Sequence, residues 1–166
     1  MQELKEKLKV YCETSFWSYM TAKPSADPEK ALRQAYTLCW WNEAAQKCDI
    51  FVSSYVYEEA QDGDIEASRK RLDEIIKWSF AIYDEVKVAN LAKKLRDEHQ
   101  IFAKEVTDAF HIAVAAVTHM DVLLTWNCKH MANIVELPKT VEIVSRCGYR
   151  CPRIITPEDF LEAFYD

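Results

Sequence analysis

Glycine is scarce in this sequence, which has only Gly63 and Gly148 among its 166 residues. Average usage in proteins is about 7%. Dinucleotide-binding fingerprints and P-loops both need closely spaced glycines, because the backbone must approach the phosphates of the ligand. Two glycines so far apart provide neither motif. Phosphate chemistry in this chain would therefore have to depend on side chains or on metal ions.

Other signals of a particular class of protein are also missing. No two of the six cysteines have the C-x2-C spacing of a zinc site, and the lone pair Cys147 and Cys151 indicates zinc only weakly. The sequence contains no apolar run long enough to span a membrane and does not begin with the pattern of a signal peptide. We expect a cytoplasmic protein with reduced thiols.

Positive charge is in deficit. The chain has 21 Lys and Arg against 27 Asp and Glu, which gives a net charge of −6. This balance argues against a protein that holds nucleic acid by bulk charge alone. It leaves a nuclease open, because metal-binding carboxylates make an active site acidic. With 49% hydrophobic residues, the chain is predicted to form a single domain over residues 1–166.

Short apolar runs alternate with longer amphipathic segments, a pattern that predicts an α/β fold with a parallel sheet wrapped by helices. The expected strands are Lys9–Cys12, Ile50–Ser53, Phe80–Tyr83, Val122–Thr125 and Arg153–Ile155. The expected helices are Pro28–Lys47, Asp64–Trp78, Val86–Glu98, Thr107–His119 and one that begins at Thr156–Pro157. The helix after Thr107 is almost wholly apolar, so we expect it to be buried.

Polar side chains gather where the predicted strands end, which is where ligands bind in open parallel sheets. Glu13 follows the first strand, Glu58 and Glu59 lie on a short helix after the second, and Asn127 follows the fourth. Asp108 lies in the first turn of the buried helix. Oxygen ligands of this kind suit Mg²⁺ or Mn²⁺. Each residue also has a structural interpretation, as an exposed acid or as a charge that complements a helix dipole.

Five segments carry a family resemblance, and they follow one another over essentially the whole chain: Tyr11–Tyr19, Val52–Ala60, Asp108–Ala115, Asp121–His130 and Gly148–Phe160. The most specific are the Asp-Ala-x-His-Ile-Ala pattern that begins at Asp108 and the Leu-x-Thr-Trp-Asn-x-Lys-His pattern that ends at His130. In this order and at these separations, they resemble PIN-domain proteins. The resemblance implies a three-layer α/β/α PIN-like domain with a central parallel sheet of about five strands. Many PIN domains are metal-dependent ribonucleases, including the VapC-like toxins of bacterial toxin–antitoxin pairs.

The resemblance also implies a set of site residues. The metal-binding acids of the family correspond to Glu13, Glu59 and Asp108, and the fourth catalytic position corresponds to Asn127. The family usually has Asp at the first of these positions and often has Asp at the fourth. The Glu and Asn found here leave open an alternative, a catalytically weakened PIN-fold module that binds RNA or protein.

The remaining candidates lie beside these positions and are assigned to the substrate or to the support of the ligands: Ser15, His111, Thr125, Trp126, Lys129 and His130. His111 shares a helix face with Asp108 and is interpreted as a supporting residue rather than a general base. Lys129 and His130 are placed to meet a phosphate, and Trp126 to stack on a base. Asp121 precedes its strand, so we interpret it as structural.

The predicted activity is that of a Mg²⁺- or Mn²⁺-dependent endoribonuclease, a hydrolase whose substrate is RNA. An antitoxin protein is a further candidate partner, and we expect a homodimer. The helix Pro28–Lys47 carries Trp40 and Trp41, which either pair subunits or bind a partner helix, or else are buried in the core. Core packing is also expected for Trp17 and Trp78.

Overall fold

A five-stranded, wholly parallel sheet runs through the centre of the structure, in the order β3-β2-β1-β4-β5. We describe it from a computed structural model, in which residues 6–164 are described. The strands are β1 (Leu8–Cys12), β2 (Cys48–Val52), β3 (Ser79–Phe80), β4 (Val122–Leu124) and β5 (Arg153–Ile155). Val10 of the central strand is in register with Ile50 on one side and with Val122 on the other. The strand order changes direction between β1 and β4, and ligands bind beyond the carboxyl ends of strands at such a point.

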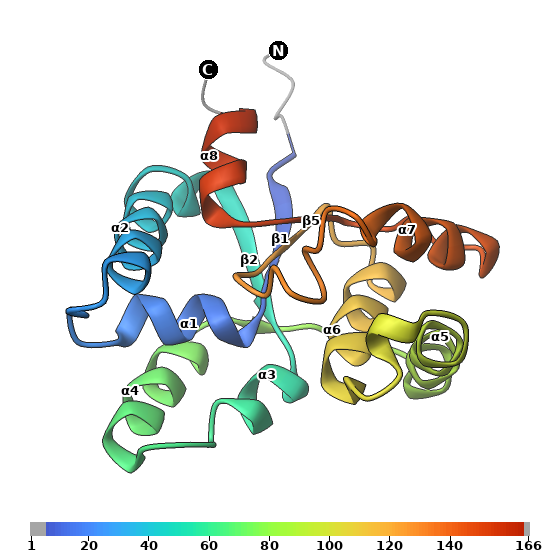
Figure 1. Cartoon of the computed structure of the whole chain (residues 1–166), viewed down its shortest axis with the longest axis horizontal. Helices are drawn as coiled ribbons and strands as arrows, with labels where there is room; N and C mark the ends of the chain where they lie inside the picture. The colour runs from blue at the N-terminus through green and yellow to red at the C-terminus, as the bar shows by residue number, and fades with distance from the viewer. Residues whose placement is uncertain (1–5, 165–166) are drawn as a thin grey trace.

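Helices cover both faces of the sheet (Figure 1). One group consists of α1 (Thr14–Thr21), α2 (Pro28–Glu43), α4 (Ile65–Ile75) and α8 (Pro157–Phe164). The other consists of α5 (Glu85–Glu98), α6 (Val106–Val117) and α7 (Leu137–Arg146). The short helix α3 (Ser54–Glu59) follows β2 directly, and two 3-10 turns cover Ala45–Lys47 and Gln100–Phe102. This arrangement confirms the three-layer α/β/α fold predicted from the sequence.

Local chemistry explains several element boundaries. Asp27 caps α2 by accepting a hydrogen bond from the Lys30 amide, and Pro28 follows in the first turn, as predicted. The helix ends at Glu43 rather than at Lys47, because its last turn tightens into a 3-10 turn. Both glycines have positive φ, +87° and +88°, and lie in turns, as expected for residues without a Cβ.

Other boundaries differ from the prediction. Strand β3 has only two residues and ends at Phe80 instead of continuing to Tyr83; it lies at the sheet edge, and Ile82 beyond it is 96% exposed. Helices α1 and α7 were not expected. Helix α7 has Pro at its start and β-branched residues within it, which have low helix propensity, although its buried residues Thr140, Ile143 and Val144 have helical spacing.

The tryptophans pack mainly in the core between α1, α2 and α4. Trp17 and Trp40 are fully buried and meet Phe16 edge-on, with ring centroids 5.2 and 5.3 Å away. Trp41 and Trp78 are partly buried against the same cluster. Core packing is therefore confirmed for these four residues. In the described part of the chain, no helix is both long and apolar enough to cross a membrane.

Candidate functional site

Glu13 directly follows β1 at the carboxyl edge of the sheet. Its amide donates to the Leu124 carbonyl oxygen at the end of β4 (3.1 Å), and its side chain is only 5% exposed. The carboxylate oxygen Oε2 accepts hydrogen bonds from the Ser15 amide (3.1 Å), the Ser15 hydroxyl (2.5 Å) and the Thr125 hydroxyl (2.7 Å). Burial raises the pKa of Glu13, although His111 and Ser15 oppose this. The other oxygen, Oε1, lies outside this set of hydrogen bonds.

Glu59, at the end of α3, is brought to the same edge because α3 follows β2 immediately. Its Oε1 lies 3.2 Å from Nε2 of His111 on α6. Burial disfavours the charged carboxylate, but the contact and charge of His111, together with hydrogen bonds from Thr14 and Glu13, outweigh burial, so the pKa of Glu59 is lowered. Glu58, its neighbour, is exposed. The structure thus places Glu59, and not Glu58, beside Glu13.

His111 is completely buried and is held from both ring nitrogens. Its Nδ1 lies 2.7 Å from the Tyr11 hydroxyl, which in turn lies 2.6 Å from Oγ of Ser53. Burial alone would lower the pKa of His111, but Glu59 and Glu13 raise it. His111 therefore lies between the Glu59 carboxylate and the Tyr11 hydroxyl and helps to fix the position of both.

Two groups of side chains have the spacing of metal ligands. In the first, ligand atoms of Glu13, Glu59 and His111 all lie within 4.8 Å of one another. Within the described residues, neither glutamate forms an ion pair with a lysine or an arginine. Two carboxylates are therefore held together at a mostly buried site, and a histidine is their one nearby basic group.

The second group consists of Glu105, Asp108 and His130, again within 4.8 Å. Asp108 is 8% exposed, and burial raises its pKa. Its Oδ2 lies 3.1 Å from Nδ1 of His130 and accepts a hydrogen bond from Nδ2 of Asn127 at 3.0 Å. Oδ1 of Asn127 accepts from the His130 amide (3.0 Å). Asn127 therefore holds Asp108 and the loop after β4 in place, a role that uses both ends of its amide.

Thr125 connects the two groups. Its hydroxyl donates to Glu13 and accepts from the Asn127 amide at 3.0 Å, so the end of β4 fixes both sets of side chains. His111 is near enough to both groups for Asp108 to raise its pKa. The structure thus brings Glu13 and Glu59 together and places Asp108 in an adjoining group.

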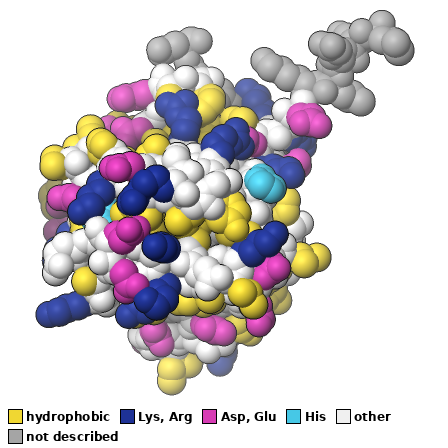
Figure 2. Space-filling view, turned by 90° about the vertical axis from the view of Figure 1, so that its right-hand side faces the viewer, with side chains coloured by type: hydrophobic (Ala, Val, Ile, Leu, Met, Phe, Trp, Pro, Cys, Tyr) yellow, Lys and Arg dark blue, Asp and Glu magenta, His cyan; other side chains and the backbone are white. Residues whose placement is uncertain are grey.

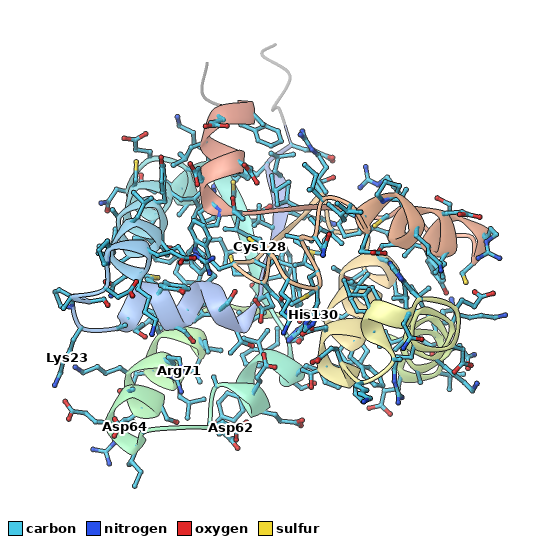
Figure 3. The ribbon with its side chains drawn as sticks, in the orientation of Figure 1. Lys23, Asp62, Asp64, Arg71, Cys128 and His130 are labelled. Atoms are coloured by element: carbon cyan, nitrogen blue, oxygen red, sulfur yellow. The ribbon has the colours of Figure 1, made fainter. Side chains whose placement is uncertain are left out.

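Residues of the loop after β4 have different surroundings. Trp126 is 5% exposed, donates from Nε1 to Thr37 (2.8 Å) and lies under the guanidinium of Arg33. A buried ring presents no face on which a base can stack. Lys129 is exposed. His130, labelled in Figure 3, is partly buried, and its Nδ1 is within hydrogen-bond distance of the Asp108 carboxylate.

Asp121 lies at the opposite edge of the sheet, before β4. Its carboxylate accepts from the Lys9 amide (2.9 Å) and from Arg150 (3.0 Å). The structural interpretation of Asp121 is therefore confirmed.

The residues at the carboxyl edge fit a divalent cation. The Thr14 hydroxyl lies beside Glu59 and helps to lower the pKa of that carboxyl. The groups gathered at this edge are therefore carboxylate and hydroxyl oxygens, together with the His111 ring. Carboxylate and hydroxyl oxygens are ligands that hard cations such as Mg²⁺ and Mn²⁺ prefer.

Sequence reasoning missed Tyr11, Thr14 and Glu105. In the sequence, Tyr11 looks like one more apolar residue of a buried strand. Its hydroxyl has a partner, His111, only in the folded structure. Thr14 gave no signal beyond its place next to Glu13. Glu105 lies three residues before Asp108 on the way into α6, a helical spacing that was available in the sequence.

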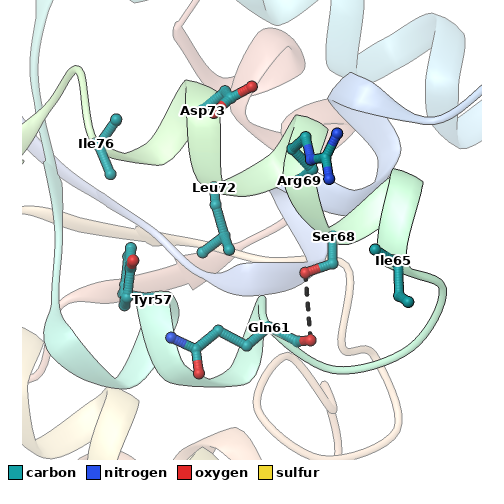
Figure 4. Close-up of a pocket in the computed structure, with 8 residues that line it drawn as sticks. All are labelled: Tyr57, Gln61, Ile65, Ser68, Arg69, Leu72, Asp73 and Ile76. Carbon is teal, nitrogen blue, oxygen red and sulfur yellow. Dashed lines mark hydrogen bonds between the residues drawn. The ribbon is translucent and has the colours of Figure 1, made fainter.

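Other surfaces have different characters. An open cavity of about 430 Å³ lies between α3 and α4, lined by apolar side chains such as Leu72 and by Gln61, whose carbonyl oxygen accepts from Ser68 (Figure 4). None of the carboxylates at the carboxyl edge lines it.

On the face shown in Figure 2, Lys and Arg side chains are interspersed with Asp and Glu. Arg146 of α7 pairs with Glu98 of α5.

Comparison with known proteins supports the fold. No protein-family model matches the sequence, and no curated protein matches it. Among solved structures, the fold is similar to a chain described as "Crystal structure of VapBC2 from Rickettsia felis bound to a DNA fragment from their promoter". The TM-score is 0.56 and the sequence identity 15%, over 90% of this chain and 98% of that chain. This likeness agrees with the predicted α/β fold built on a central parallel sheet.

Proposed function

We propose that the protein is a divalent-cation-dependent ribonuclease of the PIN type, which hydrolyses phosphodiester bonds of RNA. One observation carries the proposal: Glu13 and Glu59 are held together at the carboxyl edge of a parallel sheet, without a lysine or arginine partner among the described residues. Holding two carboxylates together at a mostly buried site, with one histidine as their basic partner, destabilises a fold, so such a pair supports a site that a cation completes. The PIN-like fold supports the same function.

The roles of the residues follow from their contacts. Glu13 and Glu59 would hold Mg²⁺ or Mn²⁺, with Asp108 as the third acid. A bound divalent cation supplies a water of lowered pKa and stabilises the charge that develops on the phosphate. Thr125 and Ser15 fix the orientation of Glu13, and Asn127 fixes that of Asp108. Lys129, exposed on the loop after Asn127, is available to the RNA backbone.

The proposal extends to partners and location. The neighbour of similar fold is described as VapBC2 bound to a promoter DNA fragment. On this basis we include an antitoxin protein and a second copy of this chain as partners, and we place the protein in the cytoplasm.

A second candidate function is a PIN-fold module that binds RNA or protein without cleaving it. The arrangement around Asn127 favours it, because the fourth catalytic position holds a neutral amide whose two ends are already hydrogen-bonded to Asp108 and His130. Such a module would bind RNA equally well with and without a divalent cation.

The test is cleavage of a labelled RNA pool with Mg²⁺ or Mn²⁺ by the wild type, Glu59→Gln and Glu58→Gln. The two variants carry the same substitution at adjacent positions, but only Glu59 contacts His111 and Glu13. We expect Glu59→Gln to lower the cleavage rate by about 100-fold or more, since metal stabilisation of a transition state amounts to several kcal/mol. Glu58→Gln retains the wild-type rate.

Two results would contradict the proposal. Equal rates in all three proteins would mean that the cleavage does not depend on this site. Binding of RNA without any cleavage, unchanged by EDTA, would establish the module instead.

A further inference from the structure

A chain of three buried side chains leads to the back of the proposed cation site. The Tyr11 hydroxyl on β1 lies between Oγ of Ser53 (2.6 Å) and Nδ1 of His111 (2.7 Å), and all three residues are 0% exposed. At the other side of the ring, Nε2 of His111 faces Oε1 of Glu59 (3.2 Å). No solvent reaches this chain, so its protons must be shared among these groups.

The number of protons available fixes which group donates and which accepts in each of these hydrogen bonds. A hydroxyl has one proton to donate. Oγ of Ser53 already accepts from the Val56 amide (3.4 Å), so its own proton is free for Tyr11. If Ser53 donates to Tyr11 and Tyr11 donates to Nδ1 of His111, every group has a partner. The neutral imidazole then carries its proton on Nε2, where it faces the Glu59 carboxylate.

The opposite direction leaves groups unsatisfied. With the proton on Nδ1, His111 would donate to Tyr11 and Tyr11 to Ser53. The Ser53 proton would then have no acceptor among the contacts described. The bare Nε2 would also face an oxygen of Glu59, and two lone pairs would meet. Buried polar groups without partners cost stability, so this direction is disfavoured.

We propose that Tyr11 is a positioning residue that keeps the proton of His111 on Nε2, so that His111 donates to Glu59 and does not itself bind the cation. The inference rests on the proposed function, in which Glu59 is a cation ligand. It selects between two chemistries that the cluster of Glu13, Glu59 and His111 allows. An imidazole ligand suits zinc-like cations, whereas a ring that only donates leaves an all-oxygen site for Mg²⁺ or Mn²⁺.

The first experiment measures the tautomer directly. Protein with ¹⁵N-labelled histidine is studied by NMR with Mg²⁺ and in EDTA, at a pH above the titration of the ring, and His111→Gln identifies the His111 signals. We expect Nε2 to carry the proton and Nδ1 to be unprotonated in the Mg²⁺-saturated protein. A protonated Nδ1 or a bare Nε2 overturns the proposal.

The second experiment measures Mn²⁺ affinity in Tyr11→Phe. Removing a partner that orients a metal ligand lowers metal affinity by about 10- to 100-fold, and we expect the lower end of this range because Tyr11 acts through His111. Tyr83→Phe is the matched control, since the Tyr83 hydroxyl bonds Oγ of Ser54 (2.8 Å) in an exposed pair. Equal affinities in the two folded variants would show that the Tyr11 hydroxyl has no such role.

A pair of substitutions at His111 separates a donor from a ligand. His111→Gln keeps an N–H that can reach Glu59, so we expect its Mn²⁺ affinity to stay within about threefold of the wild type. His111→Leu removes the donor and should lose about tenfold. An equal loss in both variants would mean that the imidazole itself binds the cation.

These results can be told apart from a failure of the proposed function. If the protein cleaves no RNA or binds no divalent cation, the nuclease proposal fails, and the tautomer in EDTA still decides the role of Tyr11. If Tyr11→Phe does not fold, the NMR spectra of the wild type and the His111 pair decide it.

Discussion

Glu13 and Asp121 are carboxylates at opposite edges of the same sheet, and they differ in burial and in the charge of their hydrogen-bond partners. Asp121 at the amino edge is partly exposed and has both a backbone donor and Arg150. Glu13 at the carboxyl edge is buried, accepts only from neutral donors and lies beside a second carboxylate. A buried charge that serves stability normally has a partner of opposite charge. Buried charges without such a partner are found mainly at functional sites. This difference between the edges is why we propose the functional site at the carboxyl edge.

The largest expected effect separates the two edges by one substitution. Asp108→Asn should lower the rate of Mg²⁺-dependent RNA cleavage by about 100-fold or more, because it removes the third acid of the proposed site. Asp121→Asn should leave the rate unchanged and lower the free energy of unfolding by about 0.5–1 kcal/mol, through loss of a surface ion pair. Cleavage assays and urea denaturation measure both. Comparable rates in the two variants would remove the distinction between the edges.

The next effect concerns the amide at the fourth position. Asn127→Asp would place a carboxylate against Asp108, where Nδ2 now donates, and should lower the free energy of unfolding by about 2 kcal/mol in EDTA. Mn²⁺ should restore part of the loss by binding the folded state. Asn133→Asp is the control, because the Asn133 side-chain oxygen accepts from the Val135 amide, a role that a carboxylate can keep. If both variants are as stable as the wild type, Asn127 does not position Asp108.

A smaller effect has the opposite sign. Glu13→Gln removes a buried charge beside Glu59, and the amide oxygen can still accept from Ser15 and Thr125, so stability in EDTA should rise by about 1 kcal/mol. Glu58→Gln, at an exposed position, should change nothing. With Mn²⁺ at about 100 times its Kd, the wild type should gain about 2.7 kcal/mol and become the more stable protein. Thermal or urea unfolding that shows no reversal would count against a cation at Glu13.

The smallest effect concerns RNA binding. Lys129→Ala, in the loop beyond the carboxyl edge, should weaken RNA binding by about two- to threefold and reduce the dependence of affinity on salt by about one phosphate contact. Lys9→Ala removes an exposed lysine from the amino half of β1 and should have no effect. Filter binding at several salt concentrations distinguishes them, and an equal change in both would indicate diffuse attraction instead of a contact.

The sequence was sufficient for the features that depend on local pattern. The parallel sheet, the buried helix around Ile112 and the cap at Asp27 all follow from periodicity and capping, and they appear in the structure. The grouping of Glu13 with Glu59 follows from topology, since residues after adjacent parallel strands meet at one edge. The choice of Glu59 over Glu58 came from the family resemblance, and the geometry agrees with it.

What the sequence could not give depends on packing between distant segments. Tyr11 and His111 are 100 positions apart, and their contact exists only because α6 packs against the sheet. The burial of Trp126 under Arg33 also comes from tertiary packing, which is why an aromatic residue beside the site seemed available to RNA. The division of the acids into two groups is a matter of a few ångströms, and strand order alone does not resolve that scale.

The cap of α1 has a practical consequence. Oε2 of Glu13 accepts from the Ser15 amide and so closes the first turn of α1, while Oε1 takes no part in the cap. The Glu13 carboxylate thus caps a helix with one oxygen and belongs to the proposed cation site. The hydrogen-exchange rate of the Ser15 amide therefore reports on Glu13 itself. The signal of this one backbone amide therefore shows whether the Glu13 carboxylate keeps its hydrogen bond to α1 when a cation is added. The measurement needs no enzyme assay.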